Sequence, residues 1–187
     1  GTLTFQFGTY DNGDNTFTAN ANKAIKTVTI DSSNNTLNGV AKAINDAKIG
    51  VTASVINDGS GWRLTLGSTD TGAANSLKIT TTDGDGNDTD AAGLSILAYD
   101  PTLIAGTGKN MQQTQDARDA RAVVDGLTVT GASNTLDKAI QGVTLNLKAT
   151  ATTATTLTVA QDNSAISSGV QSFVRAFNEL ASTVKSL

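Results

Sequence analysis

The sequence predicts an α+β protein that is mostly β, with two β-rich domains that carry short helices, followed by a helix with a heptad pattern. Three observations predict this class. Apolar and polar residues alternate over much of residues 1–160, as in strands with one solvated face. A segment that reads as helix followed by strand is present twice. From Ile166 onward, apolar residues recur every three or four positions, which indicates a helix.

The duplicated segment occupies residues 33–52 and returns in shortened form at residues 133–144. In each copy, a Thr that is suited to cap a helix follows small polar residues, and a Gly leads the chain into a β-branched strand. The apolar positions of the two expected helices are Leu37 with Ile44, and Leu136 with Ile140. The second helix is therefore expected to be little more than one turn. Since the copies share no reactive side chain, the repeat indicates architecture and not chemistry.

Composition excludes several classes of function. The 187 residues include no His and no Cys, carry a net charge of −4, and are 38% hydrophobic and 4% aromatic. Catalytic triads, thiolate chemistry and His-metal sites are therefore impossible in this chain. Lys and Arg do not cluster, so we expect no nucleic-acid partner. Apolar runs fall far short of the about 20 residues of a membrane span, so we expect no membrane insertion.

Residues 1 to about 100 predict strands around a single helix. The chain opens on a strand alternation at residues 3–7, and the helix is expected at about residues 36–47. A further short strand is expected around residues 77–79, before a polar loop at residues 83–90. Because the first residues lie within an expected strand and the last within an expected helix, we expect a segment of a longer protein.

A β-hairpin is predicted over residues 51–66. Period-two patterning flanks a five-residue loop at residues 57–61, which contains the turn signal Asp-Gly. Trp62 is in register with Leu64 and Leu66, so we expect it to be buried against the helix. The alternative is an exposed platform on which a sugar ring stacks.

The best candidate for a linker lies between residues 99 and 115, where Pro101 is followed by Gly106 and Gly108. Beyond it, residues 117–160 alternate again and predict a second group of strands. The Thr-rich composition of these strands suits the solvated face of an antiparallel sheet.

The last part of the chain, residues 162–187, predicts a helix with a narrow apolar face. Asp162, Asn163 and Ser164 form an N-cap cluster. Apolar residues then follow at alternating steps of four and three, which is a heptad seam. Such a seam needs a helical partner, which we expect outside this segment. The predicted helix-packing interface consists of Ile166, Val170, Phe173, Phe177, Leu180 and Val184, and the seam continues to Leu187.

Local acidic motifs do not predict a metal or catalytic site. Asp83, Asp85 and Asn87 match the opening of a calcium loop, but its sixth position is Asp88, where Gly is required, and its twelfth is Leu94, where Glu is expected. A solvated turn is the favoured interpretation.

The neighbouring carboxylates Asp116 and Asp119 raise the same question for catalysis. Arg118 and Arg121 interleave with them, and nothing in the sequence indicates burial, so the pair is interpreted as solvated surface. We expect no enzymatic activity, no cofactor and no catalytic residue.

An ordered series of motifs resembles the bacterial flagellar filament-capping family, whose head carries a flagellin hook "IN" motif. Ala43-Ile44-Asn45 and Gly61-Trp62-Arg63-Leu64 belong to that motif, and the likeness extends over essentially the whole chain. The matching segments are 30–37, 43–45, 50–54, 61–66, 71–75, 93–95, 97–101, 122–126, 139–145 and 170–178.

The resemblance implies a homo-oligomeric cap at the extracellular tip of the bacterial flagellum, which promotes flagellin assembly and so supports motility. It also implies a domain division. Residues 1–105 would form an outer head domain, residues 112–161 the returning part of an inner head domain, and residues 162–187 the start of a helical leg. The implied partners are flagellin and further copies of the protein itself.

Other functions stay open on the sequence. An adhesin module that binds a host surface or glycans would need exposed aromatic or acidic patches on the outer head, and a flagellin variable domain would share the IN-type motif. A glycosidase-like enzyme that works with two carboxylates would need an apolar cleft holding a Glu with a shifted pKa. Its case is weak, because the single Glu, Glu179, lies in the expected C-terminal helix.

Overall fold

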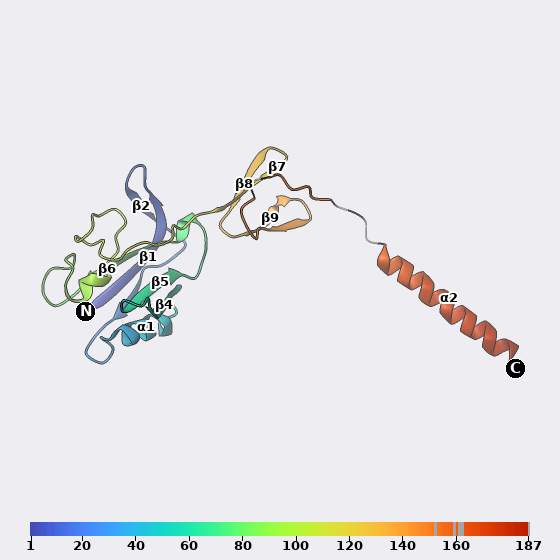
Figure 1. The fold of residues 1–187 in the computed structure, drawn as a ribbon, viewed down its shortest axis with the longest axis horizontal. Helices are drawn as coiled ribbons and strands as arrows, with labels where there is room; N and C mark the ends of the chain where they lie inside the picture. The colour runs from blue at the N-terminus through green and yellow to red at the C-terminus, as the bar shows by residue number, and fades with distance from the viewer. Residues whose placement is uncertain (152, 159, 161–162, 187) are drawn as a thin grey trace. The chain divides into compact units, whose positions relative to one another are not determined.

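The computed structural model describes residues 1–151, 153–158, 160 and 163–186, and it divides the chain into two compact units, Gly1–Lys148 and Ala149–Leu187 (Figure 1). The first unit carries ten strands and the helix α1, and the second carries the helix α2. The predicted class, α+β and mostly β with a C-terminal helix, is confirmed. Residues at the expected boundary near 161 and 162 lie outside the described part of the chain.

The first sheet is built around β1 (Thr2–Asp11), which pairs antiparallel with three strands. Strand β6 (Ser76–Thr82) runs along residues 2–8 of β1. Strands β3 (Lys26–Thr29) and β2 (Thr16–Ala19) share the other edge, pairing with residues 2–5 and 8–11. The strand alternation predicted at residues 3–7 is correct, because β1 turns every second side chain into the core.

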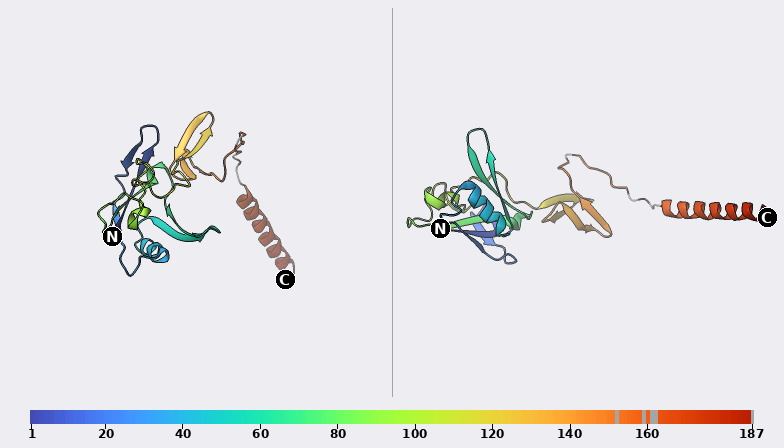
Figure 2. Two further views of the ribbon diagram at one scale, coloured as in Figure 1. Left: turned by 60° about the vertical axis from the view of Figure 1, so that its left-hand side comes forward. Right: turned by 90° about the horizontal axis from the view of Figure 1, so that it is seen from below.

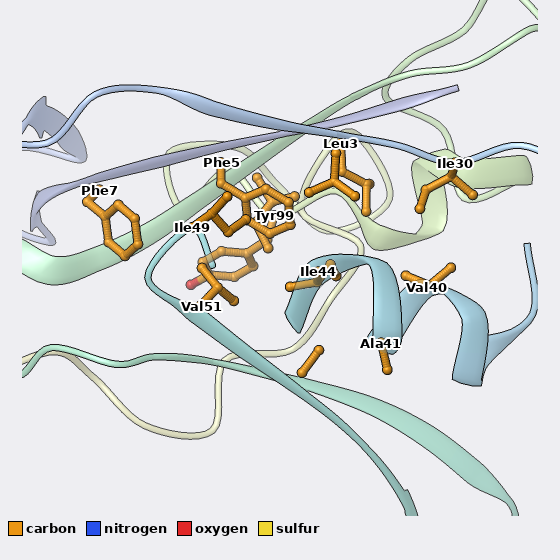
Figure 3. Close-up of a cluster of buried hydrophobic side chains, with 13 residues drawn as sticks. Leu3, Phe5, Phe7, Ile30, Val40, Ala41, Ile44, Ile49, Val51 and Tyr99 are labelled. Atoms are coloured by element: carbon orange, nitrogen blue, oxygen red, sulfur yellow. The ribbon is translucent and has the colours of Figure 1, made fainter. Parts of the chain in front are cut away.

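The core lies between this sheet and α1 (Leu37–Asp46). Leu3 and Phe5 are fully buried, and they point from β1 toward Ile44 of the helix, with Val51 and Tyr99 closing the cluster (Figure 3). Aromatic bulk enters the core mainly from β1, and aliphatic side chains surround it. This cluster is the main source of apolar burial for the first unit.

Helix α1 forms where the sequence predicts it, but its buried face differs from the expected one. Thr36 is the N-cap, and its Oγ1 accepts a hydrogen bond from the Gly39 N–H at 3.1 Å. Ile44 is buried as expected, whereas Leu37 is 41% exposed. Leu37 is the first residue of the helix, and the buried residues lie further along it. The buried face consists of Val40, Ala41 and Ile44.

The predicted hairpin is confirmed as β4 (Val51–Asn57) paired with β5 (Trp62–Ser68). Its loop has four residues, 58–61, and not the five expected, because Asn57 pairs with Trp62. The Asn45 side chain at the end of α1 bonds to both backbone groups of one β4 residue. Its Nδ2 donates to the Ala53 carbonyl at 2.8 Å, and its Oδ1 accepts from the Ala53 N–H at 2.9 Å.

We expect Asn45→Asp to lower the free energy of unfolding by about 1–3 kcal/mol, because the carboxylate cannot donate and faces the Ala53 carbonyl. Urea denaturation of the two proteins measures the loss. Asn57→Asp is the matched control, since Asn57 uses only its oxygen, which accepts from the Gly59 N–H at 2.9 Å. Equal losses in the two variants would contradict the role assigned to Asn45.

The segment predicted as a linker is part of the first unit. Tyr99 exchanges two backbone hydrogen bonds with Ile79 of β6, each 2.8 Å long, and both Tyr99 and Pro101 are buried. The short helices η1 (Ala73–Asn75) and η2 (Gly93–Leu97) flank β6 along the chain. For Tyr99 and Pro101 the linker prediction is wrong, because Pro and Gly mark turns as readily as linkers, and the bridge to β6 is a tertiary contact.

The second group of strands forms two hairpins, β7 (Ala120–Val124) with β8 (Leu127–Gly131) and β9 (Thr135–Ile140) with β10 (Val143–Asn146). The short helix expected at residues 136–140 is wrong, because these residues form β9. A step of four between Leu136 and Ile140 is even, so it suits one face of a strand as well as one turn of a helix. The sequence also predicted strand at the end of residues 117–160. There, Leu157 lies outside any strand, and Val159 is outside the described residues.

The second unit contains α2 (Ser164–Lys185), a helix of 22 residues. Asn163 occupies the N-cap position, in the middle of the predicted cap cluster, although its side chain makes no capping hydrogen bond. Among the described residues, neither α1 nor α2 combines the length and apolar character needed to cross a bilayer.

Candidate functional site

The helix α2 presents an uninterrupted row of exposed apolar side chains. Their steps of four and three place them on one face of the helix. Each is between 57% and 72% exposed, and none of the residues of α2 is buried within the described chain. We call this set the α2 stripe: Ile166, Val170, Phe173, Phe177, Leu180 and Val184.

The α2 stripe has the geometry of a helix-docking surface. Burying one large apolar side chain contributes about 1.5–3 kcal/mol to stability. Burial of all six side chains of the stripe would therefore contribute a large favourable free energy to binding. A narrow stripe with 3.5-residue spacing fits a partner helix better than a sheet. Its role as a packing interface stays a prediction. Val174, which the sequence analysis did not include, is 49% exposed and widens the stripe by one position.

Trp62 is not buried, which overturns the expectation from its register. Its side chain is 65% exposed, although it shares a face of the hairpin with the half-buried Leu64 and Leu66. The reason is distance along the strand. The hairpin projects beyond α1 toward its turn (Figure 2), so the last pair of the hairpin, Asn57 with Trp62, extends past the helix that covers the earlier pairs.

We expect Trp62→Ala to change the free energy of unfolding by less than about 1 kcal/mol, as is usual for exposed positions. Trp62 is the single Trp of the chain, so its fluorescence reports on this site alone. The emission should be red-shifted and readily quenched by acrylamide. A blue-shifted emission protected from acrylamide would contradict the exposed position.

The acidic side chains of the loop at residues 83–90 accept hydrogen bonds from the loop itself and from η2. Asp83 Oδ2 accepts from the Ser95 hydroxyl at 3.0 Å, and Asp85 Oδ1 accepts from the Asn87 N–H at 2.9 Å. The hydrogen bond from Asp85 holds the pKa of Asp83 below its usual value. For Asp85, the Asn87 N–H lowers the pKa, but the hydrogen bond to Asp83, desolvation and the negative charges of Asp83 and Asp90 together raise it above the usual value. Among the described residues, no cluster of three or more acidic side chains is placed to hold a metal ion.

The two carboxylates considered as a catalytic pair have separate structural partners. Asp116 pairs with Arg118 at 2.7 Å, and Asp119 Oδ1 accepts a hydrogen bond from the Ala73 N–H at 2.7 Å. Asp116 lines a groove together with Arg118, whereas Asp119 is not among the residues that line it.

A buried carboxylate that the sequence analysis missed is Asp100. Burial raises its pKa, but the Lys78 ammonium at 2.5 Å and the hydrogen bonds from Thr102 outweigh this, so the pKa lies below its usual value. The pair connects β6 to the segment after η2 and has a structural role. The adjacent Pro101 was the available sequence signal that this segment adopts a defined turn.

Comparisons with known proteins agree with this arrangement. The family model described as "Flagellar hook-associated protein 2 C-terminus" matches residues 117–187. The B-type flagellar hook-associated protein 2 of Pseudomonas aeruginosa is 40% identical over 160 residues, which cover 82% of this chain and 33% of that protein. Flagellar hook-associated protein 2 of Salmonella typhimurium is 34% identical over 161 residues, covering 86% and 32%.

Two crystal structures show the same fold over nearly the whole chain. FliD (HAP2) from Pseudomonas aeruginosa PAO1 matches with a TM-score of 0.69 and 35% identity, covering 97% of this chain and 75% of that one. The D1-D2-D3 domains of the flagellar cap protein FliD from Escherichia coli match with a TM-score of 0.68 and 31% identity, covering 100% and 56%. The chain spans about a third of the length of the curated relatives it matches. It belongs to the flagellar hook-associated protein 2 family.

Proposed function

We propose that the protein containing this chain caps the distal, extracellular tip of the bacterial flagellar filament, where it promotes flagellin assembly and prevents the loss of monomers. The observation that carries this proposal is the match to a cap-protein structure over 97% of the chain at 35% identity. The absence of a catalytic constellation among the described residues agrees with a structural role. Flagellin and further copies of the protein are the proposed partners, and no enzymatic activity is proposed.

The proposed domain division follows the order of the secondary-structure elements along the chain. Residues 1–105 form an outer head domain, residues 112–161 the returning part of an inner head domain, and residues 162–187 the start of a leg. The α2 stripe then docks on helices encoded outside this segment. The lengths support this proposal, since about two thirds of the related proteins lie outside the matched region.

Deleting the gene in its native strain tests the cap function. The deletion should abolish swimming in soft agar and release flagellin monomers into the medium, as measured by immunoblot, and the full-length gene should restore both. Electron microscopy of filament tips should show a terminal plug only in the complemented strain. Normal filaments in the deletion strain, with no flagellin released, would overturn the proposal.

A second role in adhesion is favoured by one observation, the exposed aromatic ring at the hairpin end. Trp62 and Ile56 are 65% and 52% exposed on neighbouring pairs of the hairpin, and exposed aromatic rings are suited to stack on sugars. Binding of the full-length protein to a glycan array, compared with Trp62→Ala, tests this role. Loss of glycan binding in the variant with motility retained supports it, and identical binding profiles contradict it.

A further inference from the structure

Within the first unit, two hydrogen bonds join the part formed by residues 1–116 to the part formed by residues 117–146, which contains β7–β10. Thr71 Oγ1 donates to the Ala132 carbonyl at 2.7 Å, and the Ala73 N–H donates to Asp119 Oδ1 at 2.7 Å. Across the described residues, no strand of either part pairs with a strand of the other. We call Thr71, Gly72, Ala73, Asp119 and Ala132 the seam.

Gly72 at the centre of the seam leaves no space for a side chain. A Cβ at this position would lie 2.8 Å from the Ala132 Cβ and 2.9 Å from the Ala132 carbonyl oxygen. The backbone also has φ +98°, a conformation that Gly adopts without the cost that other residues incur. The close approach of the two backbones therefore depends on Gly72.

Two grooves border the seam. One groove of about 440 Å³ is lined partly by residues 111–118, and another of about 730 Å³ partly by residues 129–139. Asp70, Thr71 and Asn75 line both grooves, so both grooves border the seam. Few side chains therefore pack around the seam. The contact is held by two hydrogen bonds and by the close approach of the Gly72 backbone to Ala132.

We infer that the seam is a latch that sets the angle between the two β-rich parts, and that any side chain at position 72 opens it. The two hydrogen bonds define one closed arrangement, and a Cβ at position 72 is incompatible with it. When the latch is open, the two grooves that border it give the parts room to rotate. Where the chain passes from one part to the other, residues 117–119 contain no disulfide and no strand pairing that would keep the angle.

Distances between spin labels measure this angle directly. Asp14→Cys and Lys138→Cys place one label on each part at exposed positions, and this chain has no native Cys to interfere. The experiment uses the full-length protein, with any Cys elsewhere replaced by Ser. Gly72→Ala is compared with Gly59→Ala, which also has a positive φ, of +88°, but meets no atom within 4 Å. The control reproduces the backbone strain without the clash.

Gly72→Ala should broaden the distance distribution at least twofold, while Gly59→Ala keeps the narrow distribution of the parent. A parent-like distribution in a folded Gly72→Ala protein overturns the inference. Should Gly72→Ala fail to fold, the double variant Thr71→Val with Asp119→Ala decides, because it removes both hydrogen bonds without a clash. Broadening in that variant, with unchanged circular dichroism, supports the latch, and a parent-like distribution overturns it.

Discussion

Replacing Phe5 with Ala is expected to lower the free energy of unfolding by about 3–5 kcal/mol, the range for large-to-small changes of buried aromatic residues. Phe5 is fully buried at the middle of β1 and contributes to the cluster shared with α1. Truncation removes its contacts and leaves a cavity, because the sheet on one side and the helix on the other prevent collapse. Urea denaturation of the 187-residue chain, followed by circular dichroism, measures the loss.

The chain offers a matched control for this change. Phe173→Ala removes the same side chain from a position that is 72% exposed on α2, so it should change the stability of the first unit by less than about 0.5 kcal/mol. A loss at Phe5 no larger than at Phe173 would show that the β1 cluster is not the core. The comparison separates the effect of burial from the chemical change.

The double change Phe173→Asp with Phe177→Asp is expected to abolish cap function in the full-length protein. Each Phe contributes about 1.5–3 kcal/mol when buried against a partner helix. Losing two of them corresponds to roughly two to four orders of magnitude in association, before the cost of burying charge is added. Swimming in soft agar and flagellin released into the medium are the measurements.

In this chain alone, the same double change should leave the unfolding of the first unit unaltered, since both side chains are exposed on the second unit. The control, Gln171→Asp with Ser182→Asp, adds the same charge to the opposite face of α2 and should retain function. If the Phe changes unfold the β-rich part, α2 belongs to its core and the proposed boundary near residue 161 is wrong. If the control is equally defective, added charge and not the α2 stripe explains the loss.

The agreement between sequence and structure is best where a pattern is local and long. The β1 alternation, α1 with its Thr36 cap and the β4–β5 hairpin were all predictable, because side-chain periodicity, cap chemistry and Asp-Gly turns follow from backbone geometry within a few residues. The helix predicted in the second copy of the duplicated segment was wrong for a related reason. Four residues between Leu136 and Ile140 satisfy both periodicities, and the segment is too short for length to decide.

The α2 stripe was also predictable from a local pattern. Its heptad spacing, and the lack of a comparable helix in the sequence, predicted an apolar face without a packing partner in this chain. The structure leaves each of these side chains exposed. The helix that packs against the α2 stripe is a proposal, because we place that partner outside this segment.

The sequence by itself determined the order and type of most elements, the absence of His and Cys chemistry, and the apolar face of α2. Only the tertiary structure decided that Trp62 extends past α1, that Tyr99 pairs with Ile79 of β6, and that Asp100 is buried beside Lys78. It alone placed Gly72 against Ala132. The physical reason is sequence separation: periodicity and capping arise between near neighbours, whereas burial and close approach depend on partners tens of residues away, which no local pattern encodes.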